Sequence, residues 1–191
     1  MTFQQILKDS SYNLDLFTQA EKDAFESTII TREVKGKPAY YAPCLIRGKE
    51  IKLKPEEVVR QLYLNRLLNE YGYPKQRIAV ELPVKFSSET KYADICIFDK
   101  DNPTSAYILV ELKKPKFKDG KDQLKSYCHA TGSPIGVWTN GGQISFYHRK
   151  DPNYFEEITD IPTSAQTLTA RHLTPVARLQ ATVPSPRRPK H

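Results

Sequence analysis

The sequence contains only three cysteines among its 191 residues, Cys44, Cys96 and Cys128. An odd number at wide spacing matches neither a disulfide framework nor the paired spacing of a zinc site. Cys96 and Cys128 stand among apolar neighbours, where cysteine behaves as a small core residue. We therefore expect free thiols and a reducing, cytoplasmic setting.

Long apolar runs are also missing. No stretch approaches the roughly 20 apolar residues that cross a bilayer, and the first residues lack the basic and apolar regions of a secretory signal. With 39% hydrophobic and 27% charged residues, the composition is that of a globular protein long enough to bury a core. The sequence predicts one domain with appendages and no membrane partner.

Motifs of two other enzyme classes are absent. The sequence has no G-x-x-x-x-G-K-[ST] loop, which argues against ATP hydrolysis by this chain. Its four histidines do not show the H-x-x-x-H spacing of a zinc hydrolase. No helix-turn-helix or zinc-finger pattern that reads bases is evident either.

Most of the excess positive charge lies at the end of the chain, so the rest of the chain has little. The formal net charge is +7, but residues 161–191 hold five basic residues and no acidic one, which leaves 24 basic against 22 acidic residues in 1–160. Bulk charge therefore barely supports nucleic-acid binding, and any such surface must come from local clustering. One dense basic group is present, at Lys113, Lys114, Lys116, Lys118, Lys121 and Lys125. These lysines could equally well belong to a loop and a helix face that are only exposed to water and bind no nucleic acid.

The apolar pattern predicts an α/β fold. Helices are expected over residues 14–31, 55–71 and 119–130, and strands over 51–53, 76–86, 93–98, 107–112, 134–139 and 143–149. Residues 1–13 are polar and expected to be loose, and Pro83 suggests an edge strand. The strand–helix–strand order from Val110 to Val137 implies a parallel pair, and short connections imply antiparallel pairs elsewhere. We expect an α/β domain with a mixed central sheet of about five strands flanked by helices.

Three parts of the chain are expected. Residues 1–46 form an N-terminal helix and an extended lead-in, and residues 47–161 form the main domain. Residues 162–191 are basic and rich in Pro, Thr and Ser, a composition typical of a disordered tail.

Acidic side chains occur at two neighbouring apolar strands. Asp94 opens the strand over 93–98, and Glu111 and Lys113 end the strand over 107–112 on one shared face. Two carboxylates and an ammonium at the polar end of a buried sheet would suit a hard divalent cation. An ordinary strand end with solvated charges would give the same pattern, and Glu-x-Lys occurs at three other places in the chain.

The wider spacing resembles a known nuclease pattern. Asp94, then Glu111-Leu112-Lys113, then Gln123-x-x-x-Tyr127 resembles the PD-(D/E)xK superfamily with its trailing Q-x-x-x-Y. More narrowly, the chain from Arg47 to Ile161 is similar to the N-terminal nuclease domain of type I restriction enzyme R subunits. The resemblance implies that the mixed central sheet is restriction-endonuclease-like.

Two details qualify this resemblance. Ala93 stands where the superfamily has the proline that gives it its name, a position of backbone geometry rather than chemistry. Some relatives add a glutamate from the helix before the strands, and the resemblance assigns that role to Glu57, although Glu56 is adjacent and both also suit a helix N-terminus. Glu81 is a lesser candidate for the metal site.

The resemblance implies a Mg²⁺-dependent DNA endonuclease, with Mn²⁺ as a substitute. Asp94 and Glu111 would hold the metal, Lys113 would act beside the attacking water, and Gln123 and Tyr127 would support Lys113 or touch DNA. Motor, methylation and specificity subunits would be partners. The alternative is a non-cleaving nucleic-acid-binding or assembly module that keeps the nuclease fold.

Overall fold

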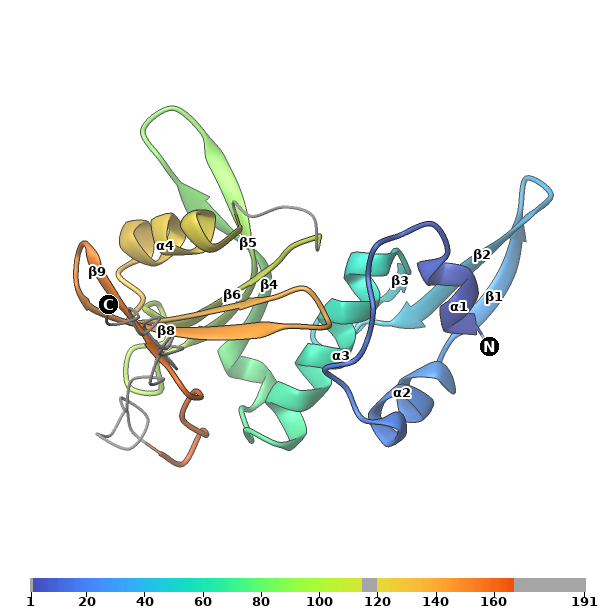
Figure 1. Ribbon diagram of the computed structural model, residues 1–191, viewed down its shortest axis with the longest axis horizontal. Helices are drawn as coiled ribbons and strands as arrows, with labels where there is room; N and C mark the ends of the chain where they lie inside the picture. Colours follow the sequence, from blue (N-terminus) through green and yellow to red (C-terminus); the bar gives the residue numbers. More distant parts are fainter. Residues whose placement is uncertain (1, 115–119, 167–191) are drawn as a thin grey trace, which may run out of the picture.

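The computed structural model describes residues 2–114 and 120–166 and contains two sheets and four α-helices in those ranges (Figure 1). The N-terminal part comprises α1 (Thr2–Leu7), α2 (Gln19–Glu26) and an antiparallel sheet of β1 (Ile30–Val34), β2 (Lys37–Pro43) and β3 (Glu50–Lys52). The remaining elements are α3 (Pro55–Asn69), a 3₁₀ turn η1 (Lys75–Arg77), β4 (Ile78–Lys85), β5 (Thr90–Phe98), β6 (Ala106–Leu112), α4 (Gly120–Thr131), β7 (Ile135–Thr139), β8 (Ile144–Asp151) and β9 (Tyr154–Ile158).

The main sheet has six strands in the order β4-β5-β6-β7-β8-β9. Only β6 and β7, which α4 connects, are parallel, and every other neighbouring pair is antiparallel. The predicted mixed α/β sheet is therefore confirmed, with β4 and its Pro83 at an edge. The expected five strands become six because β9 folds back on β8, through a turn in which the Asp151 carboxylate accepts from the N–H groups of Asn153 and Tyr154 at 3.0 Å.

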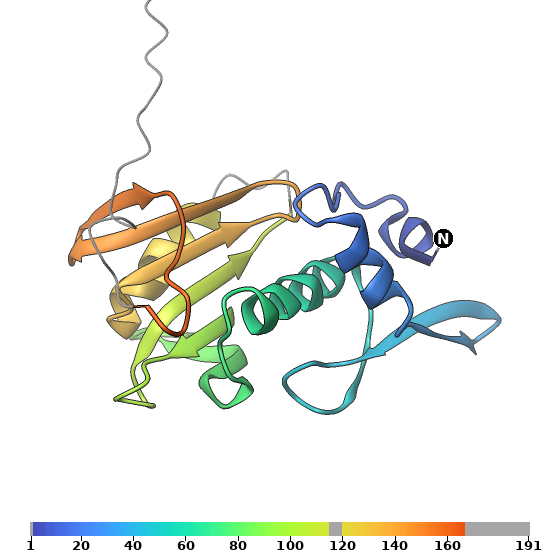
Figure 2. The same cartoon turned by 90° about the horizontal axis from the view of Figure 1, so that it is seen from below.

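Helices cover both faces of this sheet. Helix α3 begins at Pro55, whose missing N–H costs nothing there, and lies between the two sheets in both views (Figures 1 and 2). Its buried apolar residues join one core cluster with Ile95, Ile97 and Val110 of the main sheet. Helix α4 packs on the opposite face, where Leu124 and Tyr127 meet Leu109.

The N-terminal residues differ from the prediction. Residues 2–7 form α1 instead of a loose segment, because Phe3 and Ile6 are buried and the Phe3 ring stacks 6.0 Å from Phe25. The helix expected over 14–31 is shorter. It begins after Thr18, whose hydroxyl accepts from the Glu21 N–H at 3.2 Å while the Glu21 carboxylate accepts from the Thr18 N–H at 2.7 Å.

The chain after β9 returns to α3. Ile161 is buried, the Tyr73 hydroxyl donates to the Pro162 carbonyl at 2.6 Å, and the Ser164 N–H donates to the Tyr71 carbonyl at 2.8 Å. Residues 167–191, most of the expected tail, lie outside the described residues, and the boundaries at residues 46 and 161 stay predictions. Nowhere in 2–114 or 120–166 is a helix long and apolar enough to span a bilayer.

These contacts predict a difference between two shortened chains. Ending the chain at Asp160 removes buried Ile161 and the acceptor of the buried Tyr73 hydroxyl, which together contribute roughly 3–5 kcal/mol. Ending it at Gln166 keeps both contacts. We expect the shorter chain to melt about 10 °C lower than the longer one, as measured by circular dichroism. Equal melting temperatures would show that residues 161–166 add nothing to stability.

Candidate active site

Strands β5 and β6 separate where the acidic residues lie. Their pairing ends at Ile95 opposite Val110, and the same register places Asp94 opposite Glu111. Beyond that pair the Asp94 carboxylate accepts from the Leu112 N–H at 2.7 Å. The Asp94 carboxylate thus takes the place of the main-chain carbonyl that would otherwise accept from the Leu112 N–H. This hydrogen bond fixes Asp94 where the two strands separate. The structure therefore brings together the two carboxylates that the sequence indicated.

Glu111 is a buried carboxylate with an incomplete set of partners. Its residue is 1% exposed, and its Oε1 lies 2.9 Å from the Lys113 Nζ. Its Oε2 is buried and has no hydrogen-bond partner among the described residues. Burial raises the pKa of Glu111 to about 8, and the negative charge of Asp94 adds to the rise against the opposing effect of Lys113. The environment of this carboxylate is deficient in positive charge.

Arg60 of α3 is a central residue of the site that the sequence analysis missed. Its guanidinium is buried and lies 2.6 Å from Asp94 Oδ1, 3.3 Å from Glu56 Oε1 and in contact with Glu57. Arg60 lies three positions after Glu57 and four after Glu56, a spacing that predicts ion pairs along a helix. The contact with Asp94 depends on the packing of α3 against the sheet, which local sequence does not reveal.

The two neighbouring glutamates of α3 face different partners. Glu57 accepts from the Gln61 side chain at 2.9 Å and contacts Arg60. For Glu56, burial raises the pKa, the charge of Asp94 raises it further, and Arg60 and Lys113 lower it. Glu56 therefore lies within electrostatic reach of both Asp94 and Lys113. Both glutamates contact Arg60, so the role that the resemblance suggested for Glu57 stays a prediction.

Glu81 occupies a strained position in the edge strand β4. Its φ of 56° falls in the left-handed region, which is uncommon for a residue with a side chain. The register on either side, Val80 opposite Ile95 and Leu82 opposite Ala93, places it across from Asp94. Its carboxylate lies 2.9 Å from Arg47 and 3.8 Å from Arg60, so it joins the Arg60 network at the margin of the site.

Helix α4 supports Lys113 from the other side. Gln123 donates to the Tyr127 hydroxyl, and Tyr127 is buried. Burial raises the pKa of Tyr127, the Gln123 hydrogen bond lowers it, and the charges of Glu111 and Lys113 also affect it, which places the pair beside the two strand residues. A Cβ at Gly120 would collide with the Lys113 side chain and lie 2.5 Å from Trp138 Nε1. The first residue of α4 must therefore be glycine for the Lys113 side chain to pack against it.

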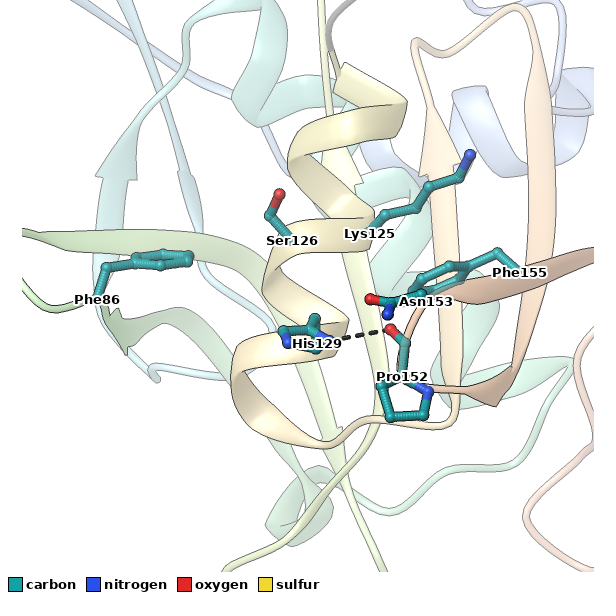
Figure 3. A pocket seen from close by; sticks show the side chains of 7 residues that line it. All are labelled: Phe86, Lys125, Ser126, His129, Pro152, Asn153 and Phe155. Carbon is teal, nitrogen blue, oxygen red and sulfur yellow. Dashed lines mark hydrogen bonds between the residues drawn. The ribbon is translucent and has the colours of Figure 1, made fainter.

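The basic group found in the sequence is divided. Lys121 and Lys125 lie over aromatic rings, with the Lys121 Nζ 5.2 Å from the Trp138 ring centre and the Lys125 Nζ 5.5 Å from that of Tyr147. Lys116 and Lys118 lie outside the described residues. The pocket beside Lys125 is lined by residues of α4, Phe86 and the β8–β9 turn, and His129 Nδ1 lies 2.9 Å from the Pro152 carbonyl (Figure 3). This pocket contains none of the acidic residues of the site.

A second cavity opens beside Arg60 and three of the glutamates that contact it, and its lining does not include Asp94, Glu111 or Lys113. Glu56, Glu57, Arg60 and Glu81 form one part of its lining. The rest comes from the region of β3, where the basic residues are Arg47, Lys49, Lys52 and Lys54. The cavity therefore combines carboxylates with a basic rim.

The residues fit a divalent cation, although no preformed cluster of three or more metal-binding side chains occurs in the described ranges. Asp94 and Glu111 are the two candidate ligands. The unpartnered Oε2 of Glu111 is the buried acceptor that a cation would satisfy, and carboxylate oxygen is the ligand type that Mg²⁺ prefers.

The Arg60 network predicts a large stability effect. Arg60→Ala leaves buried Asp94 without its cation, so we expect the free energy of unfolding to fall by about 3–5 kcal/mol in urea titrations. Arg32→Ala breaks an exposed pair with Glu50 and should cost less than about 1 kcal/mol. Mn²⁺ should recover part of the loss in Arg60→Ala. A small loss equal to that of the control would show that the network does not stabilise the fold.

Comparison with known proteins identifies the family of the chain. No curated protein matches the sequence. Among solved structures, a candidate nuclease of the DUF820 family from Anabaena variabilis ATCC 29413 is similar at 14% identity and a TM-score of 0.43, over 67% of this chain and 87% of that one. The family described as the type I restriction enzyme R protein N terminus matches residues 55–162, from the first residue of α3 to beyond β9. That match covers more than half of the chain, which therefore belongs to the family of type I restriction enzyme R protein N-terminal domains.

Proposed function

We propose that this chain is a metal-dependent DNA endonuclease module. The observation that carries the proposal is the meeting of Asp94, Glu111 and Lys113 where β5 and β6 separate, inside a chain of the restriction enzyme R protein family. The three buried, free cysteines are consistent with a cytoplasmic setting. Motor, methylation and specificity subunits of a restriction-modification complex are the proposed partners.

In this proposal Asp94 and Glu111 hold Mg²⁺ or Mn²⁺. The bound cation supplies Lewis-acid polarisation of the scissile phosphate and lowers the pKa of water. Lys113 contacts Glu111 as an ammonium, so its N–H groups orient the attacking water or stabilise charge on the phosphate. Gln123, Tyr127 and the close approach of Gly120 restrict where the Lys113 side chain can lie.

The basic rim supports DNA as the substrate. The folded region is nearly neutral overall, but Lys49, Lys52 and Lys54 line the cavity that contains Glu56 and Arg60, together with the acidic Glu50. Phosphate contacts dominate non-specific affinity for DNA. A rim of three lysines gives modest binding, so selection of DNA would depend on the partner subunits.

One observation favours the alternative of a non-cleaving assembly module. Both oxygens of Asp94 already have partners, Arg60 on one side and the Leu112 N–H on the other. A site whose charges are balanced by protein groups could persist without a metal. Cleavage assays separate the two functions.

The first functional prediction concerns catalysis. We expect weak, sequence-independent nicking of plasmid DNA with Mg²⁺ or Mn²⁺, abolished by EDTA. Lys113→Ala should reduce the nicking rate at least ~100-fold, since it removes a charge that acts in the transition state, and should leave the melting temperature within a few degrees. Lys114→Ala, an exposed neighbour, should have a mild effect. Equal losses in both variants, or no metal-dependent nicking by the unaltered chain, would contradict the nuclease proposal.

A second functional prediction concerns the basic rim. Replacing Lys49, Lys52 and Lys54 together by alanine should weaken duplex binding and flatten the plot of log affinity against log salt by about 1 per lysine. Fluorescence anisotropy with Ca²⁺ in place of Mg²⁺ measures this. The matched control replaces Lys8, Lys75 and Lys100, which are exposed and absent from the cavity lining. The same salt dependence in both triple variants would exclude the rim as the DNA surface.

A further inference from the structure

The segment before α2 lies outside the matched residues 55–162 but is fixed against them. The Leu16 N–H donates to the Gly141 carbonyl at 3.0 Å, and the Leu16 carbonyl accepts from the Arg66 side chain at 3.0 Å. A Cβ at Gly141 would lie 2.5 Å from the Asn13 carbonyl and 3.0 Å from Val59. Residues 13–16 thus lie between the β7–β8 turn and α3, as both ribbon views show (Figures 1 and 2).

This placement brings Tyr12 to the acidic end of α3. Asn13, the next residue, is beside Val59, and Glu56 lies three residues before Val59 on the same helical face. The Tyr12 ring packs against the core, while its hydroxyl is buried and has no hydrogen-bond partner among the described residues. Burial raises the pKa of Tyr12, the charges of Glu56 and Asp94 and the approach of the hydroxyl to the Glu56 carboxylate raise it further, and Arg60 lowers it. The hydroxyl therefore faces the candidate site.

A phenol in this place can act only as a donor to a carboxylate. It keeps its proton at neutral pH, and a buried hydroxyl without a partner is unfavourable. The two Asp94 oxygens already accept from Arg60 and the Leu112 N–H. One Glu56 oxygen is paired with Arg60, and the other has no hydrogen-bond partner among the described residues. Glu56 is the acceptor that the geometry leaves for Tyr12.

We propose that Tyr12 is a positioning residue of the cation site, donating to Glu56 and holding that carboxylate toward Asp94 and Glu111 as a third acidic group. This inference rests on the metal site proposed above. Hydrogen bonds to the groups that surround a metal commonly change its affinity by ~10–100-fold. The N-terminal segment is then part of the active site, and a chain shortened to the matched residues would have an incomplete one.

Calorimetric titration of the 191-residue chain with Mn²⁺, without DNA, tests the inference. Tyr12→Phe keeps the packed ring and removes only the hydroxyl, and we expect it to weaken Mn²⁺ binding about 10-fold. Tyr40→Phe is the matched control. It also removes a phenolic hydroxyl from the N-terminal part, one that donates to the Gln5 side chain at 2.6 Å, and it should leave the affinity unchanged.

A double-mutant cycle separates positioning from a general structural effect. If Tyr12 acts through Glu56, then adding Tyr12→Phe to Glu56→Gln should change Mn²⁺ affinity by less than ~2-fold. Unchanged binding in Tyr12→Phe alone, an equal 10-fold loss in the Glu56→Gln background, or no Mn²⁺ binding by the unaltered chain would overturn the inference. Mn²⁺ binding with the expected losses, but no DNA cleavage, would support the role of Tyr12 and reject the nuclease function.

Discussion

The structure depends on compensating buried negative charge at the open end of a sheet. Asp94 and Glu111 lie opposite each other on adjacent strands, where removal from water disfavours both charges and each disfavours the other. Arg60 reaches Asp94 from α3, and Lys113 reaches Glu111 from the same strand. Removing Arg60 would leave the buried Asp94 carboxylate without its cation, which is among the most destabilising changes that a protein interior can undergo.

Several local irregularities serve this arrangement. The two strands separate after Ile95 and Val110, so the Asp94 side chain reaches the Leu112 N–H that a strand partner would otherwise use. Glu81 adopts a left-handed conformation across from Asp94. Gly120 lets α4 approach the Lys113 side chain. These irregularities lie at the site, as expected where function competes with stability.

The sequence predicted the parts of this site that depend on local pattern. The apolar run that begins beside Asp94 and the one that ends at Glu111 indicated adjacent strands, and the four-residue spacing of Gln123 and Tyr127 indicated one helical face. Arg60 and Tyr12 could not be found in this way, because their contacts join segments 34 or more residues apart. The choice between Glu56 and Glu57 also depends on how α3 is rotated against the sheet, and a helix buried on several sides has too weak an apolar stripe to define that rotation. The helix α1 was missed because its two buried side chains pack only against distant residues such as Phe25.

The charge of the ion-paired network is consistent with a divalent cation. Its carboxylates are Glu56, Glu57, Glu81, Asp94 and Glu111, and its cations are Arg47, Arg60 and Lys113. Five carboxylates against three cations leave an excess of two negative charges, the charge that one Mg²⁺ or Mn²⁺ would balance. Burial is the main cause of the raised pKa of Glu111, and the charge of Asp94 adds to it although Lys113 lies 2.9 Å away. Within this group the Glu111–Lys113 pair is balanced, whereas Glu56, Glu57, Glu81 and Asp94 share Arg47 and Arg60. The excess of negative charge therefore lies on the α3 side, around Asp94.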